Sequence, residues 1–274
     1  MSDRRIYLDN AATSFPKPPA VFEAMLRYGT EVGASPGRGH YAEAREGAAV
    51  LRRCRERICE FIGGENPDHI VFTLNTSDAL NLAIKGAVRA RRLAAPGMDH
   101  NSVLRPFNAL ATEPGVEATL VDCDPATGRI DPAAIEAAIR PTTALVAVVH
   151  SSNVGGVIQP VEAIGEICRR RGVLYLIDGA QSLGHVPFNA QQAHADLVAM
   201  PGHKGLLGPQ GTGALYIRPG AQDRIATTRE GGTGQQSELD VQPSDMPSKY
   251  EAGSHNTIGL AGLSEGVKFL LSRG

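Results

Sequence analysis

One lysine, Lys204, lies in a glycine-rich stretch near the end of the chain, AMPGHKGLLGPQGTGALYIRPG (residues 199–220). Glycine costs conformational entropy on folding, so a cluster of glycines predicts unusual backbone torsions or the close approach of another group. A lysine amine held in such a place can form a Schiff base with an aldehyde. The same stretch also fits a surface turn with a solvated lysine, because glycine clusters mark loops first.

Asp178 is the second residue whose position indicates chemistry. It ends the apolar stretch VLYLI, where desolvation of a carboxylate is costly. Pyridoxal phosphate catalysis needs a lysine and a buried Asp in one pocket. The lysine binds the cofactor aldehyde, and the Asp keeps the pyridine nitrogen protonated so that the ring accepts electrons. The alternative is that Asp178 caps a helix that begins in DGAQS.

Other polar residues would suit the rest of such a cofactor. Thr76 and Ser77, at a predicted helix start, offer amides and hydroxyls to a phosphate, although Ser77 alone fits a helix cap equally well. His100 could lie against the ring, or form structural hydrogen bonds. Gln181 and Asn153 are neutral hydrogen-bonding residues suited to the phenolic oxygen or to a substrate carboxylate.

Composition narrows the class of protein. The 274 residues are 42% hydrophobic, enough for a large core, and 27 basic residues nearly balance 29 acidic ones. This balance argues against a partner that is nucleic acid or a membrane surface. No stretch is apolar enough to span a bilayer, and the N-terminus has no signal-peptide core. The four cysteines show no zinc-like spacing, and none lies where we would assign a nucleophile. They fit reduced thiols in a cytoplasmic protein: Cys54, Cys59, Cys123 and Cys168.

Strand and helix patterns alternate along the chain. Segments that contain strands are predicted at 69–73, 116–124, 143–153, 173–182, 195–204 and 211–220, and helices at 44–63, 77–92, 131–139 and 160–172. This alternation predicts an α/β three-layer sandwich, with a mostly parallel sheet covered by helices on both faces. Ligands of such sheets bind beyond the carboxyl ends of the strands. The polar clusters NTSD, HSSN, DGAQS and PGHK all follow strands, so we expect Lys204 to face a shared pocket.

The order of the motifs resembles the cysteine desulfurase family, whose members are class V aminotransferase-like enzymes dependent on pyridoxal 5'-phosphate. The matching stretches are YLDNAATSFPKPPAV, GRGHY, FTLNTSDALNLAIKG, HNSVLRP, HSSNVGG, DGAQS, GHKGLLGPQGTGALYI, EGGTGQQS and EAGSHNT. They cover essentially the whole chain. The resemblance implies the large domain of the aspartate aminotransferase-like fold (fold type I).

The resemblance also implies a role for each matching residue. Lys204 would be the Schiff-base lysine, Asp178 the pyridinium partner, and His100 the residue stacked on the ring. The remaining implied contacts are Gln181 with the phenolic oxygen, Asn153 with the substrate, and Thr76, Ser77 and His203 with the phosphate. Thr233 would complete that phosphate site in the second subunit of a homodimer, and Arg38 would lie near the entrance.

The chain departs from the family pattern in three places. Pro201 stands where relatives usually have Ser or Thr, so one hydrogen bond to the phosphate is expected to be missing, which weakens affinity roughly tenfold to a hundredfold. ARRLAAPGMD, before His100, is a poor strand sequence. Relatives also continue with a C-terminal part that carries a substrate-binding arginine and a persulfide-forming cysteine loop, and none of the four cysteines here matches that loop.

These observations predict an N-terminal segment at 1–20, a cofactor-binding large domain at 21–242 and the start of a small domain at 243–274. The expected function is sulfur removal from L-cysteine on Lys204, with an amino-acid substrate and a sulfur-acceptor protein as partners and no metal. Two alternatives stay open: another pyridoxal phosphate reaction (aminotransferase, β-lyase or racemase), or a cofactor-binding protein without turnover. A nicotinamide dehydrogenase is disfavoured, because GPQGTG has the wrong glycine order and leads into a strand.

Overall fold

The computed structural model describes residues 6–37, 39–87, 92–96, 99–234 and 240–273. Its strands form a seven-stranded sheet in the order β1-β7-β6-β5-β4-β2-β3. Their bounds are β1 Ile70–Thr73, β2 Arg92–Pro96, β3 Glu117–Val121, β4 Leu145–Val149, β5 Leu174–Asp178, β6 Leu197–Pro201 and β7 Gly213–Ile217. Only β7 runs antiparallel to its neighbours, so the predicted mostly parallel sheet is confirmed.

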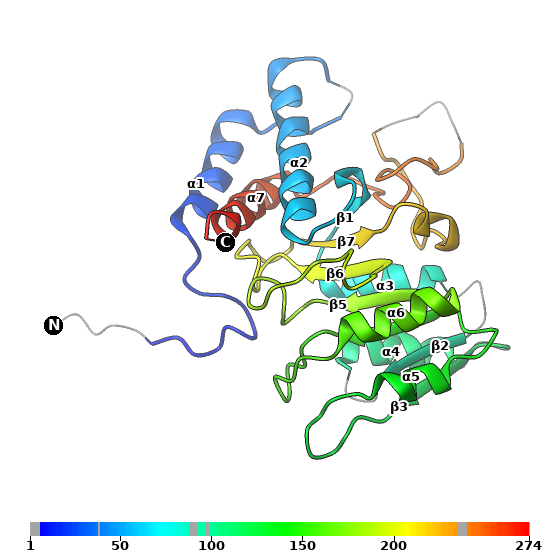
Figure 1. The fold of residues 1–274 in the computed structure, drawn as a ribbon. Helices are drawn as coiled ribbons and strands as arrows, with labels where there is room; N and C mark the ends of the chain where they lie inside the picture. The colour runs from blue at the N-terminus through cyan, green and yellow to red at the C-terminus, as the bar shows by residue number, and fades with distance from the viewer. Residues whose placement is uncertain (1–5, 38, 88–91, 97–98, 235–239, 274) are drawn as a thin grey trace.

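The central strands are buried on both faces, which explains their continuous apolar sequences. In β5, Leu174 and Leu176 face one core cluster, whereas Tyr175 and Ile177 face the other. The first cluster is covered by α3 (Thr76–Ala87) and α4 (Asn101–Leu110). The second is covered by α2 (Ala42–Phe61), α5 (Pro132–Ala138), α6 (Val161–Arg171) and α7 (Thr257–Leu271). Two helical layers therefore enclose the sheet, as predicted (Figure 1).

The helices begin and end where their sequences provide capping groups. Gly172 follows α6 in the left-handed conformation (φ 66°), and three arginines occupy the last turn, where cations favour the helix dipole. At the start of α3 the predicted cap is wrong. The side chain of Asn75, not Ser77, accepts a hydrogen bond from the Asp78 amide (2.9 Å), because Ser77 already lies within the first helical turn.

A strand precedes His100 after all. The stretch ARRLAAPGMD lacks β-branched residues, and we expected no secure strand there, but β2 pairs in parallel with both β3 and β4. The residues of this stretch have a low intrinsic propensity for the strand conformation. Position between two neighbouring strands overrides that propensity, since each neighbour satisfies backbone hydrogen bonds.

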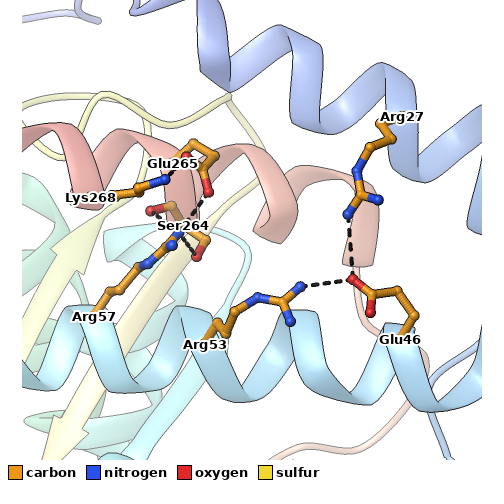
Figure 2. Close-up of polar contacts among 7 residues, drawn as sticks. All are labelled: Arg27, Glu46, Arg53, Arg57, Ser264, Glu265 and Lys268. Carbon is orange, nitrogen blue, oxygen red and sulfur yellow. Dashed lines mark hydrogen bonds and ion pairs between the residues drawn. The ribbon is translucent and has the colours of Figure 1, made fainter.

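The first and last helices pack together beside α2. The helix α1 (Pro19–Arg27) contacts α7, and α7 contacts α2. Figure 2 shows polar contacts on these helices. Glu46 of α2 accepts from Arg27 of α1 (3.4 Å) and from Arg53 of its own helix (2.9 Å), and Arg57 of α2 pairs with Glu265 of α7 (2.8 Å). These pairs are at least partly exposed, so they orient the helices more than they stabilise them.

A buried ion pair ties the segment before α7 to the sheet. Arg55 of α2 forms two hydrogen bonds with the Glu251 carboxylate (2.8 and 2.7 Å), and the Phe72 amide of β1 donates to the same carboxylate (2.6 Å). The Arg55 guanidinium lies 4.1 Å from the centre of the Phe72 ring. The segment that we assigned to a small domain is thus anchored to the large domain, and the domain boundary itself stays a prediction.

None of the helices in the described part of the chain combines the length and the apolarity that a membrane span requires.

Candidate active site

The carboxyl ends of β1, β4, β5 and β6 meet at one edge of the sheet, because these strands are parallel to one another. A cavity opens there. It is lined by Asn75, Thr76, Ser77, His100, Ser102, Val149, Asn153, Asp178, Ala180, Gln181, His203 and Lys204. Among the described residues that we predicted to bind the cofactor or substrate, all except Thr233 line this cavity. The four polar clusters that follow the strands therefore converge as expected.

Close backbone packing explains the glycines around Lys204. A Cβ atom on Gly205 would lie 1.9 Å from the Leu183 carbonyl oxygen, and one on Gly202 would lie 2.0 Å from the Thr212 hydroxyl. Hydrogen bonds close the loop, from the Gly202 amide to the Thr212 carbonyl (2.8 Å) and from the Leu207 amide to the Lys204 carbonyl (2.9 Å). The lysine is therefore held on a rigid loop, and the solvated-turn interpretation is wrong.

Lys204 and Asp178 interact across the cavity. Burial raises the pKa of Asp178 to about 6, although the Ala180 amide (2.9 Å) and the Lys204 charge both oppose the shift. Burial lowers the pKa of Lys204, and the Asp178 charge opposes that change. No ion pair joins these two described side chains directly. At neutral pH the site thus holds an ionised carboxylate and a lysine that loses its proton more readily than a solvated one. The turn after Asp178 starts no helix, so the helix-cap alternative is wrong.

His100 lies at the start of α4 in a small hydroxyl network. Its Nδ1 accepts from the Ser102 amide (3.1 Å) and lies 2.9 Å from the Ser102 hydroxyl, which is 2.7 Å from the Ser77 hydroxyl. Burial, the Lys204 charge and the Arg105 charge lower the pKa of His100. The imidazole is therefore neutral at pH 7, with its proton on Nε2. Ser102 escaped the sequence analysis, although its place two residues after a helix-capping His was a usable signal.

The start of α3 provides the anion-binding end of the cavity. The Thr76 hydroxyl is buried and has no hydrogen-bond partner among the described residues. The first N–H groups of a helix also lack acceptors within the helix, and they attract negative charge. A buried hydroxyl without a partner at such a position is the donor set that a phosphate requires. The cavity therefore fits pyridoxal phosphate, with an anion site, an amine and a carboxylate.

His203 is held by the N-terminal segment. The Thr13 hydroxyl lies 3.1 Å from His203 Nδ1, and the Ser14 amide and the Lys17 ammonium donate to the His203 carbonyl (3.1 and 3.0 Å). Gln181 also contacts this segment, donating to the Ala11 carbonyl (3.1 Å). Sequence analysis missed these contacts, because 170 to 190 residues separate the partners and no local pattern connects them.

The other predicted residues occupy different surroundings. Asn153 is exposed at the cavity, in the loop after β4. Thr233 lines a separate cavity with Arg55, Glu251 and His255, so within one chain it is not part of the Lys204 site. Pro201 ends β6 and does not line the cavity. Arg38 lies outside the described residues.

The thiols of the described chain do not reach the cavity. Burial raises the pKa of Cys54 and of Cys168 to about 12, and burial also raises the pKa of Cys59. A buried thiol of this kind is a poor nucleophile, because the thiolate is the reactive form. Cys123 is partly exposed near the end of β3 and is not a cavity residue. Within the described ranges, no cluster of His, Cys, Asp and Glu is arranged to hold a metal ion.

Comparison with known proteins agrees with this geometry. The family model described as Aminotransferase class-V matches residues 6–274. A relative from Methanothermobacter thermautotrophicus, described as a probable cysteine desulfurase, is 39% identical over 97% of this chain and 66% of its own. The solved cysteine desulfurase of Thermococcus onnurineus superposes with a TM-score of 0.90 at 35% identity, covering 98% of this chain and 68% of its own. SspA, solved in complex with cysteine, superposes with a TM-score of 0.83 at 28% identity, covering 96% and 72%. The chain thus spans about two thirds of the length of these relatives.

Proposed function

Because the chain belongs to the class-V aminotransferase family, we propose that it acts as a pyridoxal phosphate-dependent enzyme of the cysteine desulfurase type, removing sulfur from L-cysteine. The observation that carries the proposal is the meeting of Lys204, buried Asp178 and the unpartnered Thr76 hydroxyl in one cavity. When bound, pyridoxal phosphate supplies an electron sink that stabilises negative charge at the substrate Cα.

Two residues of the chain would control protons in the reaction. Lys204 would hold the cofactor aldehyde and then, as a free amine, move the proton at the substrate Cα. Its lowered pKa favours this role, since a neutral amine accepts a proton near neutral pH. Asp178 would hold a proton on the pyridine nitrogen. Its pKa of about 6 keeps it ionised at pH 7, as this role requires.

The remaining residues would bind and orient. Thr76, Ser77 and His203 would hold the phosphate, with Thr233 of a second copy completing the site in a homodimer. His100 would lie against the ring, with its Nδ1 already engaged by Ser102. Gln181 would exchange its contact with Ala11 for the cofactor's phenolic oxygen.

L-Cysteine is the proposed substrate because the relatives named above are cysteine desulfurases and SspA was solved with cysteine. Asn153, exposed at the cavity, would accept or donate a hydrogen bond to the amino acid. Breaking the Cβ–S bond passes a neutral sulfur atom to a thiolate, which becomes a persulfide, while Cβ gains a proton and leaves as alanine. Because no described cysteine lines the cavity, a sulfur-acceptor thiol must come from outside this region.

Product analysis tests the proposal and separates it from other reactions. The chain, loaded with pyridoxal phosphate, is incubated with L-cysteine and dithiothreitol as acceptor. We expect equal amounts of alanine and sulfide, and neither product from Lys204→Ala. Pyruvate and ammonia would instead indicate a β-lyase, an oxo acid an aminotransferase, and D-cysteine a racemase. Cofactor binding without any product would leave a non-catalytic binding protein and refute the desulfurase proposal.

A further inference from the structure

The backbone carbonyl of His203 has its hydrogen-bond donors in the N-terminal segment. Other carbonyls of the Lys204 loop are satisfied within it, since that of Gly202 accepts from Gly208 (2.7 Å) and that of Lys204 accepts from Leu207 (2.9 Å). The His203 carbonyl instead accepts from Ser14, through its amide and its hydroxyl (both 3.1 Å), and from the Lys17 ammonium (3.0 Å). Residues 13–17 therefore complete the loop that carries the lysine.

Lys17 uses its whole donor capacity in this contact. An ammonium group has three N–H donors. Lys17 lies 3.1 Å from the Ser14 carbonyl, 2.8 Å from the Ser14 hydroxyl and 3.0 Å from the His203 carbonyl. The side chain is half-buried, forms no ion pair with a described carboxylate, and has a pKa lowered by burial. The Lys17 side chain thus directs its ammonium inward onto three neutral oxygens, which indicates a structural role for Lys17 in this contact.

The Thr13 hydroxyl lies within hydrogen-bond distance of two acceptors, but it can donate to only one of them. It lies 3.0 Å from the His203 carbonyl and 3.1 Å from His203 Nδ1, and it has one proton to donate. A carbonyl oxygen has two lone pairs, and Ser14 with Lys17 already supplies three donors. The Thr13 proton is therefore surplus at the carbonyl and available to Nδ1.

The protonation of His203 gives this choice a consequence. Burial and the charges of Lys204 and Lys17 lower the pKa of His203, so the ring is neutral at pH 7 and carries a single N–H. If Thr13 donates to Nδ1, the single proton of the ring resides on Nε2, and the ring can donate it to an anion. If Nδ1 keeps the proton instead, Nε2 presents a lone pair and repels one. His203 lines the cavity, so the difference acts on whatever binds there.

We propose that Thr13 and Lys17 are positioning residues for anion binding: Lys17 and Ser14 saturate the His203 carbonyl, and Thr13 thereby holds the imidazole in its Nε2–H form. The segment at 13–17 thus prepares a donor for a phosphate group before the ligand arrives. The identity of that phosphate as the cofactor's rests on the proposed function, whereas the tautomer does not.

The tautomer is measured directly by nitrogen-15 NMR of the cofactor-free chain at pH 7.5, with His203→Gln used only to assign the resonance. We expect a protonated Nε2 and a bare Nδ1 in the wild type. In Lys17→Met, the His203 carbonyl loses the ammonium, and the Ser14 hydroxyl loses the group that holds it beside that carbonyl. Thr13 should then turn to the carbonyl, and Nδ1 should gain proton occupancy. A wild-type ring protonated on Nδ1, or an unchanged ring in the variant, would overturn the proposal.

Ligand affinity provides the second readout. Dissociation constants for pyridoxal phosphate and for pyridoxal are compared in wild type, Thr13→Val and Lys17→Met, with Thr30→Val as the control for hydroxyl loss on an exposed helical segment. We expect both site variants to lose about tenfold in affinity for pyridoxal phosphate, the effect of one lost hydrogen bond to a charged group, and almost nothing for pyridoxal.

The outcomes separate the inference from the proposed function. An equal loss for both ligands would reduce Thr13 and Lys17 to structural residues and refute the inference. If the wild type bound neither ligand, the proposed function would fail, and the tautomer measurement would still decide the inference. Should Lys17→Met not fold, Thr13→Val and the wild-type spectrum provide the test, since neither requires it.

Discussion

At the scale of single residues, the site is defined by burial as much as by residue type. Lys204 and Asp178 were predictable because each follows an apolar strand and the two suit one chemistry. Their shifted pKa values were not predictable, since these depend on neighbours that the sequence does not reveal. The same holds for the unpartnered Thr76 hydroxyl, which only a three-dimensional structure identifies.

Asp178 should cost the folded chain stability at neutral pH. Its pKa rises from 3.8 to about 6 on folding, so the folded state binds the proton more tightly than the unfolded state, and stability falls as pH rises between these values. We expect Asp178→Asn to unfold at higher urea than wild type at pH 7.5, by up to about 3 kcal/mol. The gain should shrink by about 2 kcal/mol at pH 4.5. A gain that is equal at both pH values would contradict the burial argument.

At the scale of elements, the parallel strands and their helices followed from the alternating patterns, whereas β2 and the cap of α3 did not. β2 is a strand because of its neighbours, which its own sequence does not encode. The contacts of residues 13–17 with His203 join the N-terminal segment to the Lys204 loop, and no periodicity predicts contacts between residues so far apart in the sequence.

The Lys204 loop should not tolerate side chains at its closest approach. In Gly205→Ala, the new Cβ would lie 1.9 Å from the Leu183 carbonyl, so the loop must shift. We expect a lower melting temperature and at least tenfold slower covalent capture of pyridoxal phosphate at Lys204. Gly29→Ala, where the nearest atom would be 3.8 Å away, is the matched control and should change neither. Wild-type capture by Gly205→Ala would show that the loop is not rigid.

The buried pair of Arg55 and Glu251 should matter far more than the exposed pairs on the same helix. Burial alone would raise the pKa of Glu251. The charges and hydrogen bonds of Arg55 and His255 nevertheless hold this pKa below its usual value. Arg55→Met leaves that carboxylate without its main counter-charge, and we expect a loss of about 3–5 kcal/mol in urea unfolding.

Arg53→Met is the control for this variant, because Arg53 forms an exposed pair with Glu46 on the same helix. It should cost less than about 1 kcal/mol. Equal losses for the two arginine variants would refute the anchoring role assigned to Arg55.

At the scale of the whole molecule, the site of one chain is incomplete if Thr233 belongs to it. Thr233 lines a different cavity from Lys204, so it can serve a phosphate only in another copy. The chain also spans about two thirds of the length of its relatives.

Mixed dimers test the shared site. Lys204→Ala and Thr233→Val chains, each impaired alone, are combined by unfolding and refolding together. One site of each mixed dimer would then have an intact Lys204 and an intact Thr233, so about a quarter of all sites, as random pairing gives, should regain wild-type affinity for pyridoxal phosphate. Sedimentation should report a dimer. Failure to recover any wild-type sites, or a monomer with full affinity, would exclude the shared arrangement.

The most direct test of the central claim is where pyridoxal phosphate attaches. The purified chain is mixed with the cofactor, its visible absorption is recorded, borohydride is added, and the labelled peptide is mapped by mass spectrometry. The site described here predicts an absorption band that borohydride removes, with the label on Lys204 alone and none in a Lys204→Ala chain that keeps the wild-type circular dichroism. A label on other lysines, or no band at saturating cofactor, would contradict the assignment of this cavity as a pyridoxal phosphate site.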